Sequence, residues 1–468
     1  MEKKQMTIVI AAVVVVAIVA IAAFAIMNNG NGGSGGDADN GARVGEEVPR
    51  AKLPNEDSRL WVYGNANEDD YMDKTDLTVL KEMVNGNRAA TQLADANADG
   101  KIDDNDVKYL EKILAATSST EMDVYYVDNY FLVAKVSWPV KSIATGYCSG
   151  LYVAETTGLT PKITMINDEI DTYWKYLNPY TQKAKLTGST DAPNYEAIIG
   201  GNVDVYVPGY CDAKADPLSR TSLNPVGIDT MFINTCDNSG LQDYPNEYID
   251  RSIVMFGYLL QGDMEQTYKY LEWHDKVLKS VEDFAKTISD EKAWIMSRHA
   301  PSYRTGTFNI TGPNNTNLIH AEWAGCYCIG DHSATINKNY TPLTLEQILA
   351  VLKQDAYDKG YTEVYWMDNE HDGFRHQYDL DETVKSWHDA LTEASPTMYY
   401  MGMAREAGNS PLYIIELVFY QQFMYGYTEY DYEDLFEYWV DNFTYSPEIY
   451  KANMDIGDFY KFYGTMDD

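Results

Sequence analysis

Oxygen-bearing side chains recur at alternate positions in two acidic stretches of the sequence, residues 65–76 and 95–106. A chain that loops around a cation turns every second residue inward, and Ca²⁺ takes six to eight oxygen ligands. We therefore expect positions 1, 3, 5, 9 and 12 to supply side-chain oxygens and position 7 to supply a backbone carbonyl. The predicted ligands are Asn65, Asn67, Asp69, Tyr71, Asp73 and Asp76, then Asp95, Asn97, Asp99, Lys101, Asp103 and Asp106. Calcium is the cofactor that this pattern predicts.

The two stretches differ at position 6, where such a loop turns sharply. Gly100 stands there in the second stretch and tolerates a positive φ. Asp70 stands there in the first, where we expect strain and a weaker site. Position 12 is Asp in both, although an ordinary EF-hand has Glu. Apolar residues at helical spacing follow each stretch, at 77–84 and 107–114, so each loop is expected to lead into a helix.

This pair of loop-and-helix units resembles a type I dockerin over residues 61–116. The resemblance implies a small, all-α, EF-hand-like domain, which we place at 57–117. Dockerins bind cohesin modules largely through loop positions 10 and 11, so a cohesin partner is implied as well. The residues at these positions are Lys74, Thr75, Asp104 and Asn105. The alternative is a calcium-stabilised spacer that has no cohesin partner.

An apolar run at 8–27 follows two lysines near the N-terminus. It is long enough to cross a bilayer, and the lysines favour a cytoplasmic N-terminus with the rest of the chain exported. Residues 1–27 are therefore predicted to form a single-pass transmembrane helix that anchors the protein in the cell membrane. Removal as a signal peptide at Ala23-x-Ala25 is the competing interpretation. Residues 28–56 are rich in Gly, Asn and Asp and are predicted to be a flexible linker.

Charge and cysteine content exclude two classes of protein. The formal net charge of -35 excludes a duplex nucleic-acid partner, because phosphate contacts need a basic face. Five cysteines are too few for a disulfide scaffold. Cys211 and Cys236 each follow a predicted strand and could be bridged. Cys326 and Cys328, two positions apart, suit a mutual bridge poorly.

A long amphipathic helix is predicted over residues 265–290, with apolar residues at helical spacing and no Pro or Gly inside. Short apolar strands alternate with helices on both sides of it, which favours parallel sheets covered by helices. The predicted fold class is therefore α/β, with two α/β lobes, 118–264 and 291–468, joined by this helix. An ordinary helix inside one large domain is the alternative. Ligands of such sheets bind at the carboxyl ends of the strands.

Four segments in this order resemble the substrate-binding proteins of ABC importers that take up ferric siderophores, haem and cobalamin. They are PVKSIA at 139–144, APNYEAIIGGNVDVYV at 192–207, PLTLEQILAVL at 342–352 and EIYKANMDIGDFYKFYG at 448–464. The sequence departs from the pattern at Gly200, Gly201 and Asn202, where Lys-Pro or a similar pair usually precedes the Asp. The resemblance implies a metal-chelate or tetrapyrrole ligand between the lobes. It also implies that Glu196 and Glu346 dock onto an ABC permease.

Large planar or chelated ligands need aromatic walls and a few ionic groups. The candidate ligand-binding residues are Tyr147, Cys148, Asn238, Arg298, His299, Tyr303, Trp323, Tyr327, Trp366, His371 and Arg405. Each of these has an ordinary structural alternative, such as a paired surface Arg or a packed Tyr.

Two other functions stay open. Dockerins are most often fused to glycoside hydrolases, and Asp368, Glu370 and Asp372 could supply paired carboxylates. The chain has no nucleophile elbow, zinc-protease motif or P-loop, so we predict that it is not an enzyme. A structural surface protein held by a cohesin is the third interpretation.

Overall fold

The computed structural model describes residues 44–49, 52–55, 57–168, 170, 184–190, 192–208, 215–233, 247–298, 307–313, 315–369, 397–403, 410–453 and 460–465, with the isolated residues 386, 389–391, 393 and 457. The predicted membrane anchor, residues 1–27, lies outside this part of the chain. Within it, no helix is both long and apolar enough to cross a membrane.

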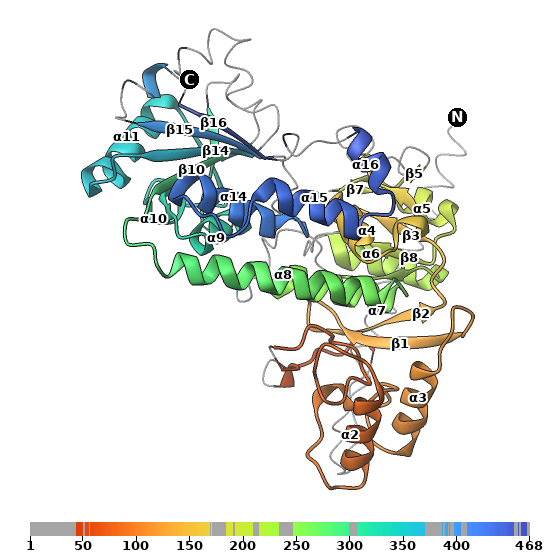
Figure 1. Ribbon diagram of the computed structural model, residues 1–468. Coiled ribbons are helices and arrows are strands. Elements are labelled where there is room, and N and C mark those ends of the chain that lie inside the picture. Colours follow the sequence, from red (N-terminus) through yellow and green to blue (C-terminus); the bar gives the residue numbers. More distant parts are fainter. Residues whose placement is uncertain are drawn as a thin grey trace, which may run out of the picture.

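The two acidic stretches form loops that lead into a pair of helices, α2 (Lys74–Val84) and α3 (Asp104–Leu114), as predicted. Each helix begins with a capping box. The side chain of the Asp at loop position 9 accepts a hydrogen bond from a backbone N–H of the first turn, and the side chain of the Asp at position 12 accepts one from the backbone N–H of position 9. The helices bury their apolar faces in a common core. We refer to residues 57–117 as the loop module; it lies below the rest of the molecule in Figure 1.

A hairpin joins the loop module to the rest of the chain. Strand β1 (Met122–Val127) pairs antiparallel with β2 (Val133–Trp138). Val62 of the module bridges to Tyr126 of β1, and Glu47 bridges to Leu132 beside β2. Residues 45–48, predicted as part of a flexible linker, therefore extend the edge of this hairpin through backbone hydrogen bonds with residues 131 and 133.

The N-terminal lobe contains a parallel sheet in the order β5-β4-β3-β8-β9. The strands are β3 (Ile143–Thr145), β4 (Ile163–Ile166), β5 (Lys185–Leu186), β8 (Val205–Val207) and β9 (Asp229–Thr230), and a small pair is formed by β6 (Gly188–Ser189) and β7 (Ala192–Pro193). The helices are α4 (Ser149–Thr156), α5 (Tyr195–Gly201), α6 (Ala215–Leu223) and α7 (Glu247–Leu259). The alternation of strands and helices that the sequence predicted is confirmed here.

The predicted long helix is α8, which runs from Met264 to Ala285 and crosses between the lobes (Figure 1). Asp263 caps its first turn by accepting a hydrogen bond from the backbone N–H of Gln266. Its buried stripe includes Tyr270, His274 and Val277, spaced as one helical face requires. The helix ends five residues before the predicted boundary at 290.

The C-terminal lobe contains a mixed sheet in the order β13-β11-β10-β14-β15-β16, with β12 beside β10. Its parallel centre is formed by β10 (Ala293–Arg298), β14 (Val364–Asn369) and β15 (Met398–Met403). The other strands are β11 (Phe308–Thr311), β12 (Tyr327–Cys328), β13 (Tyr340–Leu343) and β16 (Tyr460–Gly464), and the covering helices are α9 (Thr316–Trp323), α10 (Ile329–His332) and α11 (Leu345–Asp355).

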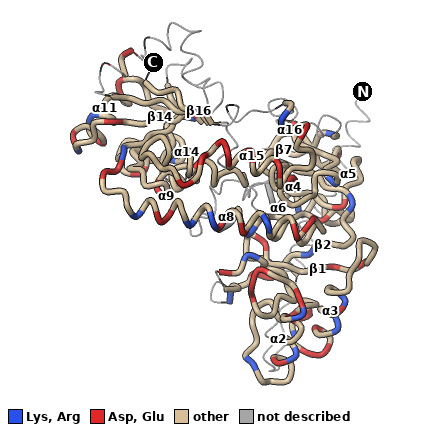
Figure 2. Tube along the Cα trace, viewed as in Figure 1, with Lys and Arg blue, Asp and Glu red and all other residues tan. Residues whose placement is uncertain are grey.

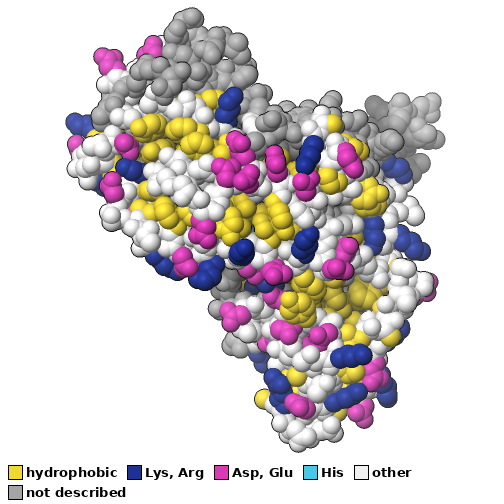
Figure 3. Space-filling model, in the orientation of Figure 1, with side chains coloured by type: hydrophobic (Ala, Val, Ile, Leu, Met, Phe, Trp, Pro, Cys, Tyr) yellow, Lys and Arg dark blue, Asp and Glu magenta, His cyan; other side chains and the backbone are white. Residues whose placement is uncertain are grey.

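A second connection between the lobes lies beside α8. Helices α14 (Tyr413–Tyr425), α15 (Tyr432–Phe443) and α16 (Pro447–Asn453) run back from the C-terminal lobe toward α4 (Figure 1). Trp439 of α15 donates a hydrogen bond to Thr156 of α4, at 3.3 Å. The ring of Trp273 of α8 stacks on that of Tyr438 of α15, with 5.7 Å between the ring centres. Hydrophobic side chains are visible on the surface of the face that carries α8 (Figure 3). The lobes are thus joined by more than the single helix that the sequence predicted.

Candidate functional site

The loops at 65–76 and 95–106 hold the same hydrogen-bond pattern. The carboxylate at position 12, Asp76 or Asp106, accepts hydrogen bonds from the backbone N–H groups of positions 3 and 9. The carboxylate at position 5, Asp69 or Asp99, accepts from the N–H of position 7. Position 4 takes a positive φ in both loops, 55° at Glu68 and 51° at Ala98. The two loops therefore share one backbone conformation and one hydrogen-bond pattern.

Two observations in these loops fit a bound cation. Asn65 is fully buried, and its Oδ1 has no hydrogen-bond partner among the described residues. Burial raises the pKa of Asp76 to about 6, and the neighbouring carboxylates of Asp69 and Asp73 act in the same direction. Burial also raises the pKa of Asp106. An unpaired oxygen and crowded carboxylates are what a calcium ion would satisfy.

The expectation of strain at Asp70 is wrong, because this residue does not adopt a positive φ. Its carboxylate instead accepts hydrogen bonds from Arg59, from the backbone N–H at 2.7 Å and from Nε at 2.8 Å. Arg59 also reaches Asp275 of α8 at 2.8 Å. Tyr268 of α8 donates to the backbone carbonyl of Asp70 at 2.9 Å, and its ring lies 4.4 Å from that of Tyr71. The first loop is therefore fixed directly to α8.

The four residues predicted to contact a cohesin are exposed. Lys74 and Thr75 open α2, and Asp104 and Asn105 open α3. No side chain of the described residues covers them. Their exposure leaves the predicted cohesin contact open to solvent, but no finding tests it.

In the N-terminal lobe, Tyr147 and Cys148 directly follow β3 and precede α4, so they lie at the carboxyl end of the central strand. Both are buried. Asn167, which follows β4, donates a hydrogen bond to Thr190 at 2.6 Å, and Thr190 donates to the carbonyl of Gly146 at 3.3 Å. The carboxyl ends of β3 and β4 are thus held together by a short polar network.

In the C-terminal lobe, Arg298 is the last residue of β10 and is partly exposed. Its guanidinium lies 4.5 Å from the centre of the Tyr340 ring and donates a hydrogen bond to the Tyr340 hydroxyl. Asp368 and the buried Asn369 end the neighbouring strand β14, and Asp368 accepts a hydrogen bond from Ser297 at 2.5 Å. Ionic and amide groups therefore gather at this edge, where ligands of such sheets bind.

Three other candidates lie away from this edge. Trp366 is fully buried in the middle of β14, packs against Phe308 at 5.6 Å and donates from Nε1 to Ser297 at 3.0 Å. Tyr327 pairs with Ala293, at the opposite end of β10 from Arg298, about 16 Å away along the strand. Trp323 ends α9 just before it, partly buried against the core. Trp366 is thus enclosed in the core, and ligand contact by Tyr327 and Trp323, which lie away from the strand ends, stays a prediction.

Asn238, His299, Tyr303, His371 and Arg405 lie outside the described residues, as do Cys211 and Cys236. Cys326 and Cys328 are buried free thiols, which agrees with the expectation that they are not bridged to each other.

Glu196 and Glu346 occupy equivalent places in the two lobes. Each lies in the first turn of a surface helix, α5 or α11, and each is exposed. Thr344 caps α11 and also donates a hydrogen bond to Glu346 at 3.0 Å. The chain is acidic over much of its surface, including α15 (Figure 2), so exposure alone does not give these two residues a role.

No protein-family model and no curated protein sequence matches this chain. Solved structures do resemble it. The molybdate-binding protein MolA of Haemophilus influenzae, bound to molybdate, has a TM-score of 0.53 at 13% identity and is matched over 69% of this chain and 99% of its own. The TroA-like periplasmic binding protein FepB of Veillonella parvula has a TM-score of 0.50 at 16% identity, over 69% and 97%. A periplasmic solute-binding protein from Veillonella parvula has a TM-score of 0.50 at 14% identity, over 71% and 97%.

The fold is that of a periplasmic solute-binding protein. At 13 to 16% identity the likeness establishes the fold alone. The similar structures are solute-binding proteins, in agreement with the prediction that this chain is not an enzyme. The comparisons give no support to the dockerin resemblance, which stays a prediction.

Sequence reasoning missed one cluster within this fold. Asp250 of α7 and His274 of α8 are buried together beside Asp275. The available signal was His274 itself, a polar residue within the apolar stripe of the long helix.

Proposed function

We propose that this chain is the extracytoplasmic solute-binding component of an ABC importer, which captures an iron siderophore, haem or a cobalamin-type ligand between its lobes. The observation that carries the proposal is the pair of sheets bridged by α8, one parallel and one mixed with a parallel centre, with polar groups at the strand ends of both lobes. Arg298 would pair with an anionic chelate, and Tyr147 would supply an aromatic wall. Asn238, His299, Tyr303, His371 and Arg405 remain proposed ligand contacts.

Delivery to a permease would use Glu196 and Glu346. A carboxylate on each lobe gives a two-point dock that Arg residues of a permease could bind through charge-assisted hydrogen bonds. Their shared position in the first turn of α5 and α11 supports this role.

We further propose that the two loops of the module bind calcium through the residues named above. The matching hydrogen-bond patterns and the unpaired Oδ1 of Asn65 support this assignment. A calcium-filled module would present Lys74, Thr75, Asp104 and Asn105 to a cohesin. The predicted membrane anchor would hold the whole assembly outside the cell.

Titration of the full-length protein with ferric siderophores, haemin, cobalamin and molybdate, at saturating calcium, tests the ligand assignment. We expect one class to bind saturably at a ratio of one per chain. Arg298→Gln should weaken an anionic ligand about 10- to 100-fold, since a hydrogen bond to a charged group contributes about 1.5–3 kcal/mol. Arg88→Gln, on the exposed surface of the module, is the matched control and should leave affinity unchanged.

Glu196→Lys and Glu346→Lys extend this test to the permease. Both variants should bind ligand normally and lose uptake in cells. Glycan hydrolysis without saturable binding would replace the importer proposal by the hydrolase alternative, and no binding of any solute would favour a structural surface protein.

Calcium affinity is expected to fall as the pH drops below about 6. Because burial raises the pKa of Asp76 to about 6 in the calcium-free fold, a bound proton stabilises that fold at low pH, and this stability is lost as the pH rises through about 6. Calcium takes the place of the proton above that range. Affinity should therefore fall by about tenfold per pH unit for each coupled carboxyl.

Calorimetric titration of calcium between about pH 7.5 and about pH 5 measures this dependence. Asp76→Asn should abolish it for the first loop, whereas Asp57→Asn, exposed and outside both loops, should retain it. A calcium affinity that stays constant across the range would contradict the assignment of Asp76 as a ligand.

A further inference from the structure

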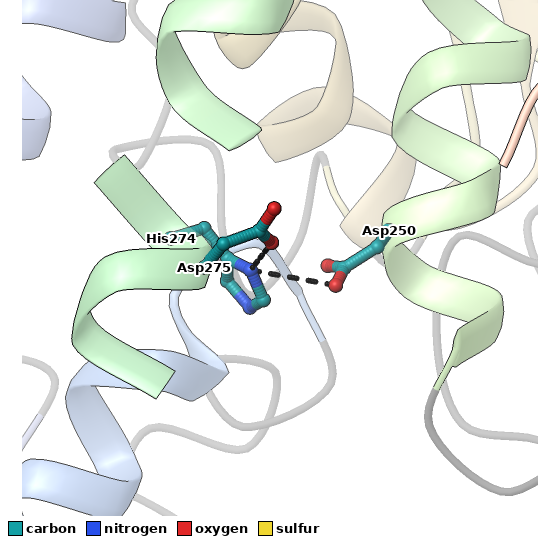
Figure 4. A group of neighbouring side chains, drawn as sticks. All are labelled: Asp250, His274 and Asp275. Carbon is teal, nitrogen blue, oxygen red and sulfur yellow. Dashed lines mark hydrogen bonds and ion pairs between the residues drawn. The ribbon is translucent and has the colours of Figure 1, made fainter. Parts of the chain in front are cut away.

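Three metal-ligating side chains converge between α7 and α8 (Figure 4), where Arg59 links Asp275 to Asp70 of the first acidic loop. Nδ1 of His274 lies 3.2 Å from Oδ1 of Asp275 and 3.4 Å from Oδ2 of Asp250. The three ligand atoms all lie within 4.8 Å of one another. Atoms bound tetrahedrally to one zinc ion at about 2.0 Å are about 3.3 Å apart. The distances of 3.2 and 3.4 Å from Nδ1 of His274 to the two carboxylate oxygens are close to this value.

Asp250 gives an independent indication that a group is missing. The residue is 7% exposed, and its Oδ1 has no hydrogen-bond partner among the described residues. Its carboxylate points toward His274 across the gap between the two helices (Figure 4). A buried carboxylate oxygen without a partner is costly, and a bound cation would satisfy it.

Negatively charged groups outnumber positively charged ones around the cluster, which favours a bound cation. Arg59 forms ion pairs with Asp70 at 2.6 Å and with Asp275 at 2.8 Å. Asp250 is a third carboxylate near the same guanidinium, so three carboxylates share one positive charge. The neighbouring aromatic groups are Tyr270, stacked on His274 at 5.8 Å, and Tyr413. Asp250 and His274 are buried and the Asp275 side chain is 49% exposed, and a divalent ion would offset the negative charge of the carboxylates.

The surrounding contacts are those of a supported metal site. Nε2 of His274 lies 2.6 Å from the Tyr413 hydroxyl of α14, which fixes the ring and leaves Nδ1 facing the two carboxylates. Arg59 donates from Nη1, at 2.8 Å, to the same Oδ1 of Asp275 that lies 3.2 Å from Nδ1 of His274. Metal-bound imidazoles and carboxylates are commonly held by such outer hydrogen bonds.

We propose that Asp250, His274 and Asp275 bind a divalent transition-metal ion of the zinc class, with water completing the coordination. Imidazole and carboxylate ligands suit such ions. The ion would join α7 to α8 at the point where the loop module, through Arg59, and helix α14, through Tyr413, meet α8. It would be a resident structural ion, separate from any solute carried between the lobes.

The test is titration of the metal-stripped full-length protein with Zn²⁺, with calcium saturating so that the loops are filled. We expect one high-affinity zinc ion per chain. Asp250→Asn and His274→Gln should each lower this affinity by about 100-fold or more, and Tyr413→Phe by about 10- to 100-fold, as an outer partner does. Asp283→Asn, on the exposed face of the same helix, is the matched control and should bind zinc normally.

A second readout needs no variant. Co²⁺ added to the stripped wild-type protein should give the visible absorption of a low-symmetry, four-coordinate site, and Zn²⁺ should remove it. Absence of both zinc binding and cobalt absorption in a folded protein would overturn the proposal and identify the cluster as a group of hydrogen-bonded side chains that holds no ion. Zinc binding that Asp250→Asn and His274→Gln leave unchanged would overturn it as well, because the ion would then lie elsewhere.

Discussion

Removal of calcium is expected to lower the free energy of unfolding by about 2.7 kcal/mol for each loop, when calcium was present at about 100 times its dissociation constant. Two filled loops would thus contribute about 5 kcal/mol. The physical reason is that Asn65, Asp76 and Asp106 lose the ion that satisfies their buried oxygens. Denaturant unfolding with calcium and with a chelator measures the difference.

The module shares one hydrophobic core with the hairpin, α7 and α8. Calcium should therefore shift the transition of the lobes and not only that of the module. Asp76→Asn and Asp106→Asn should each remove about half of the effect, and Asp57→Asn should not. If the chelator leaves the free energy of unfolding unchanged, these loops do not bind calcium.

Trp366→Ala is expected to destabilise the protein by about 3–5 kcal/mol, the usual effect of truncating a buried aromatic residue. Trp366 is fully buried between Phe308 and Ser297, so its removal leaves a cavity and takes away the donor that the Ser297 hydroxyl accepts from. Chemical denaturation of the calcium-saturated protein measures the loss.

Trp323→Ala is the comparison, because Trp323 is only partly buried at the end of α9. It should cost clearly less than Trp366→Ala. If Trp366→Ala instead preserved stability and abolished ligand binding, the placement of this residue in the core would be wrong and the prediction of a ligand contact would be restored.

Local chemistry made several elements predictable from sequence. Helices α2 and α3 begin where the alternating acidic residues end, because the Asp at position 9 that starts each helix also belongs to the loop. Thr344 and Gln347, three positions apart, form a capping box at the start of α11 in the same way. Helix α8 followed from its uninterrupted apolar spacing. Each signal depends on residues within a few positions of one another.

Long-range packing decided what the sequence could not. Asp70 is explained by Arg59 and by Tyr268, which is nearly 200 residues away in the chain. Trp366 looked like a binding residue because its type suits a cleft, yet its partners on β10 and β11 place it in the core. His274 could be recognised as part of a cluster only once Asp250 and Tyr413 had been brought beside it.

The pairing of residues 45–48 with the hairpin edge sets how far the protein can move from its predicted anchor. Only residues 28–44 remain between the apolar run and the first paired residue, Gly45. Seventeen residues span at most about 60 Å, and about 23 Å on average if they behave as a Gly-rich coil. The flexible linker that the sequence predicts here would give an effective concentration in the millimolar range. A permease in the same membrane patch would therefore meet the binding protein at that concentration, and two surface carboxylates with weak intrinsic affinity would suffice to dock it.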